Sequence, residues 1–219
     1  FCQRKGYRTV PTPPTPVIET QDEHAPRPRR VSDEDLRAIS FELAKLDPRG
    51  PMLLELLRIT GCRPSEALNL RRDCLRSEES KAGRDHFIEI RSNKKANYKV
   101  KTRSSNRSIW LPEKLWRRLH ALAPEDNSPI FQTTTKSHYH YWQERLKKAA
   151  KAAGVPKPQF RDFRNTRAAE HVRNGTPVNV YCAVMGHSPR IGLQHYAKAT
   201  LNEQAEAMRG LPAPEYGEE

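Results

Sequence analysis

Apolar residues recur every three or four positions in several stretches of the chain, a spacing that predicts amphipathic helices. Ser32 and Asp35 form a pair typical of a helix N-terminus. The stretch that follows carries apolar residues at Leu36, Ile39, Leu43 and Leu46. A second apolar helix is expected from about Met52 to Thr60, ended by Gly61. Further helices are predicted at about residues 115–122, 136–153, 160–173, 177–184 and 201–208.

The stretch 136–153 indicates a long basic helix that ends at Gly154, since glycine often follows the last helical turn. Its small and apolar residues gather on one side at helical spacing. The buried side of this helix is therefore predicted at Tyr141, Leu146, Ala149, Ala150 and Ala153.

One β-hairpin is predicted from alternating apolar and polar residues. Residues 86–90 alternate as a strand, and residues 108–111 form its expected return partner. The segment 91–109 holds seven basic residues and no acidic one, so the hairpin has a basic tip. The expected fold class is therefore α+β, a mainly helical bundle with one small antiparallel sheet.

The chain divides into three expected parts. Residues 1–30 are rich in proline, which disfavours regular helix and predicts an extended linker or arm. Residues 31–200 are expected to form one folded domain, because 36% hydrophobic residues suffice for a single core of moderate size. Residues 201–219 would add a short helix and a Pro-rich acidic tail. The chain opens at Phe1 instead of Met, so we expect a fragment of a longer protein.

The charge balance favours a nucleic-acid partner. The formal net charge is +13 with a sequence pI of about 9.8, and the basic residues concentrate between positions 91 and 173. No apolar run approaches the length of a membrane span, and no secretory segment opens the chain. A Gly-rich phosphate-binding loop is also absent from the sequence, so no nucleotide cofactor is expected.

Cysteine and histidine spacing gives no sign of a metal site. The chain has four cysteines, at Cys2, Cys62, Cys74 and Cys182. Their spacing is unpaired, which favours free thiols in a reducing compartment, and we expect a cytoplasmic, nucleoid-associated protein. His138 and His140 have a spacing seen in metal sites, but no nearby cysteine or carboxylate pair completes one. They are predicted to lie on a helix surface, and no metal or other cofactor is expected.

A further set of residues has the chemistry needed to cut a phosphodiester without a metal. A phosphodiester under attack carries charge on its two non-bridging oxygens, and the planar fork of arginine stabilises such charge. Arg63 and Arg164 would hold the phosphate from two sides, with the imidazole of His187 as a further donor. Tyr196 would be the nucleophile, since nearby cations lower the cost of ionising a phenol.

Each of these residues also has a structural interpretation. In a chain with 39 Lys and Arg, a single arginine is ordinarily solvated or salt-bridged, and a lone tyrosine usually packs. His187 directly after Gly186 fits the C-terminus of a helix. Glu66, three residues after Arg63 and preceded by Pro64, fits a first helical turn. The functional interpretation depends on all of these residues occurring together.

The order and spacing of the residues resemble the signature of the tyrosine recombinases, also called the phage integrase family. That signature reads Thr-Gly-x-Arg-x-x-Glu, a hairpin lysine, His-x-x-Arg, Leu-Gly-His, and a tyrosine nine residues later. The matching segments are 60–68 (Thr-Gly-Cys-Arg-Pro-Ser-Glu-Ala-Leu), 101–107 (Lys-Thr-Arg-Ser-Ser-Asn-Arg), 161–164 (Arg-Asp-Phe-Arg) and 185–188 (Met-Gly-His-Ser), followed by Tyr196. The resemblance covers roughly residues 32–200.

The resemblance implies a reaction and adds roles to the residues. Tyr196 would form a 3′-phosphotyrosyl intermediate with DNA, and Lys101 would protonate the departing 5′ oxygen. Lys95 and Lys99 are the alternatives for this lysine. Glu66 would support the site from behind the arginines. The implied fold is that of the family's catalytic domain, which lies on one face of the DNA duplex.

One position departs from the signature. Where the family usually has the histidine of His-x-x-Arg, this chain has Arg161. A guanidinium cannot accept a proton at working pH, so Arg161 cannot be a general base, although it can still bind the phosphate. Arg161 and Arg164 lie three residues apart, on one face of a helix. Pro156 and Pro158 fit a helix start close to Arg161. We therefore count Arg161 among the expected catalytic residues.

The expected activity is site-specific DNA strand exchange by metal-independent transesterification. The expected assembly is a homo-oligomer, a tetramer, on double-stranded DNA, in which residues 201–219 are candidates for exchange between protomers. Residues 1–30 would link the chain to a separate N-terminal domain. Two alternatives stay open: a catalytically silent DNA-binding protein of this fold, and a type IB topoisomerase-like enzyme. The basic residues expected to contact the DNA are Lys94, Lys95, Lys99, Arg103 and Arg107.

Overall fold

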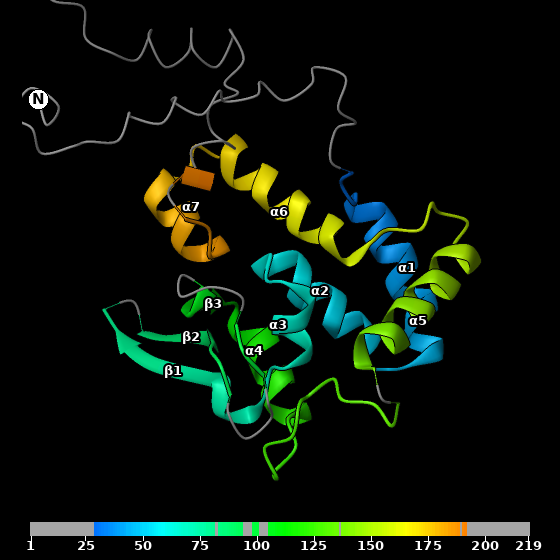
Figure 1. Cartoon of the computed structure of the whole chain (residues 1–219), viewed down its shortest axis with the longest axis horizontal. Helices are drawn as coiled ribbons and strands as arrows, with labels where there is room; N and C mark the ends of the chain where they lie inside the picture. Colours follow the sequence, from blue (N-terminus) through cyan, green and yellow to red (C-terminus); the bar gives the residue numbers. More distant parts are fainter. Residues whose placement is uncertain are drawn as a thin grey trace, which may run out of the picture.

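The computed structural model describes residues 29–81, 83–93, 98–100, 105–135, 137–188 and 190–191. Its helices are α1 (Asp33–Leu46), α2 (Gly50–Thr60), α3 (Pro64–Leu68), the 3-10 turn η1 (Arg72–Cys74), α4 (Glu113–Leu122), α5 (His138–Ala152), α6 (Phe160–Arg173) and α7 (Val178–Met185) (Figure 1). Its strands are β1 (Leu75–Ser80), β2 (Gly83–Ile90) and β3 (Arg107–Leu111). The predicted α+β class, mainly helical with one small antiparallel sheet, is confirmed.

The helices that the apolar periodicity predicted in the described residues are present, with ends shifted by up to two residues. Ser32 caps α1 as expected, since its hydroxyl accepts a hydrogen bond of 3.0 Å from the Asp35 amide. The helix predicted at 201–208, residues 1–28 of the linker predicted at 1–30, and the C-terminal tail lie outside the described residues.

Helix α2 is the centre of the helical layer. Its residues Leu53, Leu54, Leu56 and Leu57 are all buried, so a broad face of the helix belongs to the core. Helices α1 and α6 pack directly against it, and α5 packs against α1. This arrangement places the C-terminal end of α2 inside the molecule, where the chain turns toward α3.

The predicted buried side of α5 is correct in part. Leu146, Ala149 and Ala150 are buried, whereas Tyr141 and Ala153 are only partly covered. Trp142, which was not predicted, is fully buried and donates from Nε1 to the carbonyl of Phe131 at 2.9 Å. That hydrogen bond satisfies the one polar group of the indole, and so permits its burial.

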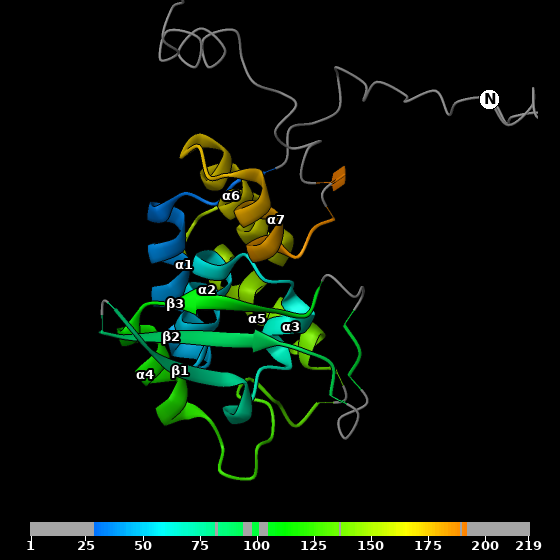
Figure 2. The same ribbon diagram turned by 90° about the vertical axis from the view of Figure 1, so that its left-hand side faces the viewer.

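The sheet has the order β1-β2-β3, with both pairs antiparallel (Figure 2). The predicted hairpin is confirmed, with Ile88 opposite Ile109. Strand β1 was not predicted, because only its first residue, Leu75, is buried and no alternation appears in its sequence. Helix α4 contacts β2, and α7 contacts β3. The sheet is therefore packed against α4 and α7, and β3 also contacts α2.

Three described cysteines, Cys62, Cys74 and Cys182, are buried free thiols. His138 and His140 lie in the first turn of α5, as predicted, and the side chain of His140 is exposed. None of the helices that the structure describes combines the length and apolar character that a membrane crossing requires.

Candidate active site

The chain between α2 and α3 turns sharply and presents Arg63. Helix α2 ends at Gly61, which adopts a left-handed conformation with φ of 60°. Arg63 is the residue before the first turn of α3, and its amide donates to Glu66 Oε2 at 2.7 Å. Pro64 follows at the first helical position, where its missing N–H costs nothing. Local sequence rules therefore fix the backbone at Arg63.

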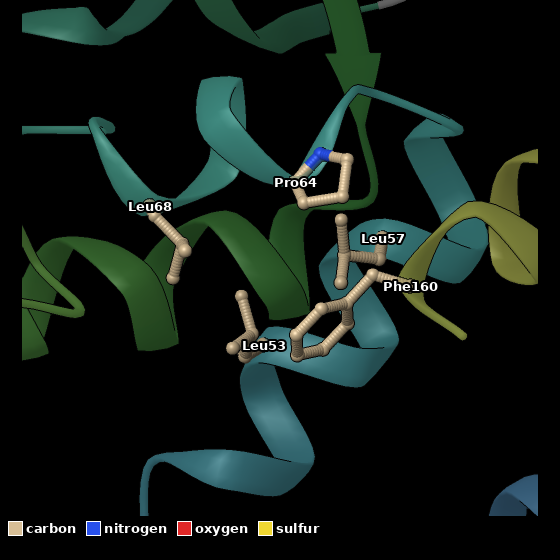
Figure 3. Close-up of a pocket in the computed structure, with 5 residues that line it drawn as sticks. All are labelled: Leu53, Leu57, Pro64, Leu68 and Phe160. Carbon is tan, nitrogen blue, oxygen red and sulfur yellow. The ribbon is translucent and has the colours of Figure 1, made fainter. Parts of the chain in front are cut away.

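Pro64 is also held from below by the apolar core. It lines a shallow apolar pocket with Leu53, Leu57, Leu68 and Phe160, which is half open to solvent and too small to hold a ligand (Figure 3). These side chains come from α2, α3 and α6, so packing ties the Arg63 turn to the start of α6. The pocket lining has no polar side chain that could orient a ligand, and we interpret it as packing.

Three arginines converge on the C-terminal end of α7. Three successive carbonyl groups there each accept a hydrogen bond from a different guanidinium. Val184 O accepts from Arg107 Nε at 2.7 Å, Met185 O accepts from Arg164 Nη2, and Gly186 O accepts from Arg63 Nη2 at 3.3 Å. The last carbonyls of a helix lack partners within the helix and carry partial negative charge, which favours cations at this position.

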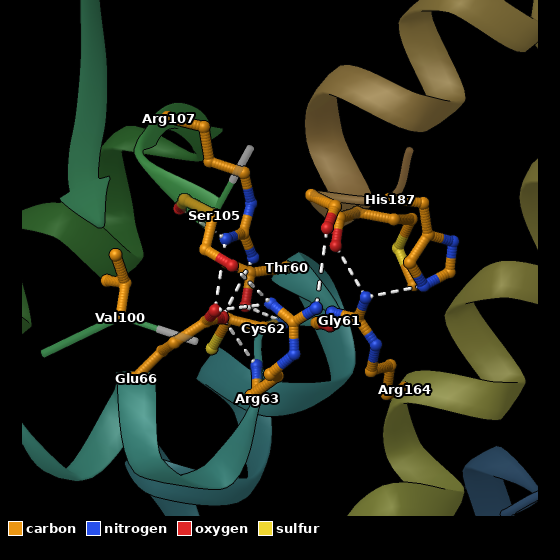
Figure 4. Close-up of polar contacts among 12 residues, drawn as sticks. Thr60, Gly61, Cys62, Arg63, Glu66, Val100, Ser105, Arg107, Arg164 and His187 are labelled. Atoms are coloured by element: carbon orange, nitrogen blue, oxygen red, sulfur yellow. Dashed lines mark hydrogen bonds and ion pairs between the residues drawn. The ribbon is translucent and has the colours of Figure 1, made fainter. Parts of the chain in front are cut away.

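Glu66 is the single carboxylate among these arginines, and it is nearly fully buried (Figure 4). Its Oε1 accepts from Arg63 Nη1 at 2.8 Å, and its Oε2 accepts from Arg107 Nη2 at 2.9 Å. Burial raises the pKa of Glu66, but the hydrogen bonds and charges of Arg107 and Arg63 outweigh it, and the pKa is lowered. Glu66 is therefore ionised at neutral pH.

Arg164 faces the same place from the first turns of α6. Its Nη1 donates to Gly61 O at 2.7 Å, and its Nη2 approaches His187 Nε2 at 2.7 Å. Because arginine only donates, Nε2 of His187 accepts and its ring proton lies on Nδ1. Burial, and then the charge of Arg63, lowers the pKa of Arg164 to about 10, so it stays charged at neutral pH.

The arrangement is suited to bind an anion. Arg63, Arg107 and Arg164 bring three positive charges against the single negative charge of Glu66. Arg63 and Arg164 repel each other, and a phosphodiester between them would offset that repulsion. Within the described residues each of these two arginines donates three hydrogen bonds, and every acceptor belongs to the same cluster of turns and helix ends.

The structure brings Arg63, Glu66, Arg164 and His187 together, as the sequence order predicted. Arg161 is exposed in the first turn of α6, one turn before Arg164. Lys101 and Tyr196 lie outside the described residues, as do Lys94, Lys95 and Arg103, so their roles stay predictions. Lys99 is exposed, as a DNA contact requires.

The prediction for Arg107 needs a correction. It was expected to contact the DNA backbone, but its side chain is only 5% exposed, and it points inward to Glu66 and Val184.

The sequence did not indicate any role for Ser105. It is fully buried, and its hydroxyl accepts from Arg63 Nη1 at 3.1 Å. A serine in a basic loop gives no signal of such a role, because the contact joins positions 42 residues apart.

Tyr181 is the described tyrosine that lies against the site, with its ring 5.5 Å from that of His187. Its side chain is fully buried, so it packs behind the histidine and cannot reach a DNA strand. Tyr98, near Glu66, has a pKa raised to about 12, first by burial and then by the Glu66 charge. A phenol of that kind is a poor nucleophile at neutral pH.

Comparison with known proteins identifies the fold independently. The family model described as "Phage integrase family" matches residues 29–203. No curated protein is similar enough in sequence to count as a match.

Solved structures share the architecture. The Tn1549 transposon integrase, solved in complex with transposon right end DNA, has a TM-score of 0.66 and 20% identity, over 89% of this chain and 69% of that one. The XerA recombinase has a TM-score of 0.57 and 19% identity, over 93% of this chain and 68% of that one. The catalytic domain of bacteriophage HP1 integrase has a TM-score of 0.57 and 19% identity, over 83% of this chain and 94% of that one. At these identities the likeness shows the fold.

Proposed function

Because the chain belongs to the phage integrase family, we propose that it catalyses site-specific DNA strand exchange through a covalent bond between Tyr196 and DNA. The observation that carries the proposal is the convergence of the Arg63 and Arg164 guanidinium groups on the end of α7, beside His187. Preorganised donors of this kind stabilise the charge that develops on a phosphodiester under attack.

The proposed reaction exchanges one phosphate ester for another. The Tyr196 phenol loses its proton to water as its oxygen attacks the phosphorus and forms a 3′-phosphotyrosyl bond, while the bond to the 5′ oxygen breaks. Lys101 gives a proton to that oxygen, which leaves as a 5′-hydroxyl. A 5′-hydroxyl from a second DNA strand then reverses the step and releases Tyr196. The number of phosphate ester bonds is the same before and after each step, so the exchange needs no nucleotide as an energy source.

The proposed partner is double-stranded DNA, bound by a homo-oligomer that is a tetramer when two duplexes are exchanged. The DNA complex of the Tn1549 integrase, which has this fold, supports the choice of partner. A nucleoid-associated location in the cytoplasm follows from that partner. Lys99 would contact the DNA backbone, together with the basic residues of segment 94–103. The linker at residues 1–30 and the exchange segment at 201–219 belong to the same proposal.

The test is covalent capture of the enzyme on a nicked suicide substrate. The short cleaved strand diffuses away, so a protein–DNA adduct should accumulate even with a chelator present. Tyr196→Phe removes only the nucleophilic oxygen, and should abolish the adduct while leaving DNA affinity within about twofold. Tyr139→Phe is the matched control, because Tyr139 is an exposed tyrosine in the first turn of α5, and this variant should form the adduct normally.

An adduct that persists in Tyr196→Phe would assign the nucleophile to another residue. No adduct from the wild-type chain would favour the catalytically silent alternative, which the exposed Arg161 in place of the usual histidine also favours. Formation of Holliday junctions by the full-length protein would separate strand exchange from the topoisomerase-like alternative.

A further inference from the structure

The guanidinium of Arg107 donates four hydrogen bonds, all to groups inside the protein. Its Nε donates to Val184 O at 2.7 Å, its Nη1 to Ser105 O at 2.9 Å and Glu66 Oε1 at 3.1 Å, and its Nη2 to Glu66 Oε2 at 2.9 Å. The side chain is only 5% exposed. A buried guanidinium with these partners cannot also bind a DNA phosphate, so its function is internal.

The contacts of Arg107 join three segments that carry parts of the site. Arg107 is the first residue of β3, Glu66 belongs to α3, and Val184 lies in the last turn of α7. Arg63 uses two of the same partners, since its Nη1 donates to Glu66 Oε1 at 2.8 Å and to Ser105 Oγ at 3.1 Å. The positions of Arg63 and Arg107 are therefore coupled through Glu66 and Ser105.

Gly186 has the conformation and the open space that Arg107 requires. It ends α7 with φ of 62°, and a Cβ atom at this position would lie 2.9 Å from Arg107 Nη1 and 3.1 Å from Cζ. The guanidinium thus lies directly against the glycine backbone. The next residue is His187, so the contact of Arg107 with this turn also helps to position the backbone of the histidine.

We propose that Arg107 is a positioning residue for strand exchange, which holds Glu66 and the end of α7 in the arrangement that places Arg63, Arg164 and His187 together. The inference rests on the proposed function. It assigns to Arg107 no contact with DNA.

The charges around Glu66 show what the loss of Arg107 would do. Glu66 has Arg63 and Arg107 as hydrogen-bond partners, and its charge also acts on Cys62, Tyr98 and Arg164. Burial raises the pKa of Glu66, and Arg107 is the largest influence that lowers it. Without Arg107 the pKa should rise, and a protonated Glu66 would no longer hold Arg63. The loss of cleavage should therefore deepen as the pH falls.

The kinetic test compares Arg107→Met and Arg107→Lys with the wild type in single-turnover adduct formation between about pH 6 and 8. Arg107→Met should slow the reaction by about 10- to 100-fold, more at the lower pH, with DNA affinity changed by less than about threefold. Arg107→Lys keeps the charge but cannot form the planar fork, so it should recover only part of the rate.

Arg58→Met is the matched control, because Arg58 is also a partly buried arginine that binds a carboxylate, Glu170, with both Nη atoms. It should lower thermal stability yet leave the cleavage rate and its pH profile unchanged well below the unfolding temperature. If Arg107→Met behaves like Arg58→Met, Arg107 is only a stabilising residue and the proposal is wrong.

A second measurement needs no activity. In the DNA-free protein, ¹³C NMR titration of Glu66 should show a higher pKa in Arg107→Met, and amide exchange at residues 184–188 should accelerate. Exchange at His187 is the most direct readout, since its amide donates to Cys182 O at 3.1 Å. An unchanged titration and unchanged exchange would overturn the proposal. If the wild type forms no adduct, the proposed function fails, while the titration still decides the role of Arg107.

Discussion

Single residues in this site are constrained by the backbone as much as by chemistry. Gly61 and Gly186 both adopt positive φ, at 60° and 62°, and both would place a Cβ atom about 3 Å or less from neighbouring side chains. Gly61 O binds Arg164, and Gly186 O binds Arg63. Each glycine therefore ends a helix and also exposes a carbonyl oxygen to an arginine of the site.

Gly186→Ala should damage the site more than the fold. The left-handed conformation costs a residue with a Cβ about 1–2 kcal/mol, and the new methyl group would also displace the Arg107 guanidinium. Gly175→Ala is the matched control, since Gly175 has φ of 61° with nothing within 4 Å of an added Cβ. Both variants should lose similar stability in a denaturant titration, but only Gly186→Ala should slow adduct formation, by about 10-fold or more. Equal cleavage rates in the two variants would contradict this role of Gly186.

At the level of secondary-structure elements, one cluster of ion pairs joins helices α1, α2 and α6. Arg58 in α2 binds Glu170 in α6 and also Asp33 in α1, at 3.1 Å. Burial raises the pKa of Glu170, but hydrogen bonds and charge from Arg58 outweigh it, and the pKa is lowered. A carboxyl with a lowered pKa in the folded state stabilises the fold above its unfolded pKa. That contribution is lost as the pH falls through the folded pKa.

The wild-type domain should accordingly lose stability as the pH falls below about 4.5, near the ordinary pKa of glutamate. Glu170→Gln should be less stable than the wild type at pH 7, by roughly 1–3 kcal/mol, because it breaks a charged hydrogen-bonded pair. The difference between the two should shrink as the pH falls through the lowered pKa that Glu170 has in the folded state. Differential scanning calorimetry of both proteins between pH 7 and pH 3 measures this difference in stability. A difference that stays constant with pH would show that Glu170 does not titrate as described.

The helices were predictable because each buries one face, and burial leaves a period of three to four residues in the sequence. Strand β1 left no such trace, since all its residues after Leu75 are exposed and only pairing with β2 orders them. At the site, the order of Arg63, Arg164 and His187 in the sequence predicted that they lie together, whereas their catalytic roles stay predictions. The inward direction of Arg107 was not predictable, because it depends on Val184, 77 residues away in the chain.

The whole molecule is strongly basic, with a formal net charge of +13. Positive residues that neutralise DNA phosphates release counterions, so affinity for duplex DNA should fall by roughly 10³-fold or more between about 50 and 200 mM salt if about six contacts form. Fluorescence anisotropy titrations at several salt concentrations measure the slope. Lys99→Ala should reduce that slope by about one. Lys45→Ala, which removes an exposed lysine paired with Glu42, should leave it unchanged. Binding that ignores salt would exclude a phosphate-based interface.

The three carbonyl groups at the end of α7 connect three charges of the site to one short element. Val184, Met185 and Gly186 are consecutive, and each accepts a hydrogen bond from a different arginine. A rigid shift of α7 would therefore change the surroundings of all three guanidinium groups at once. The position of one short helix end is thus a shared determinant of where the whole set of charges lies.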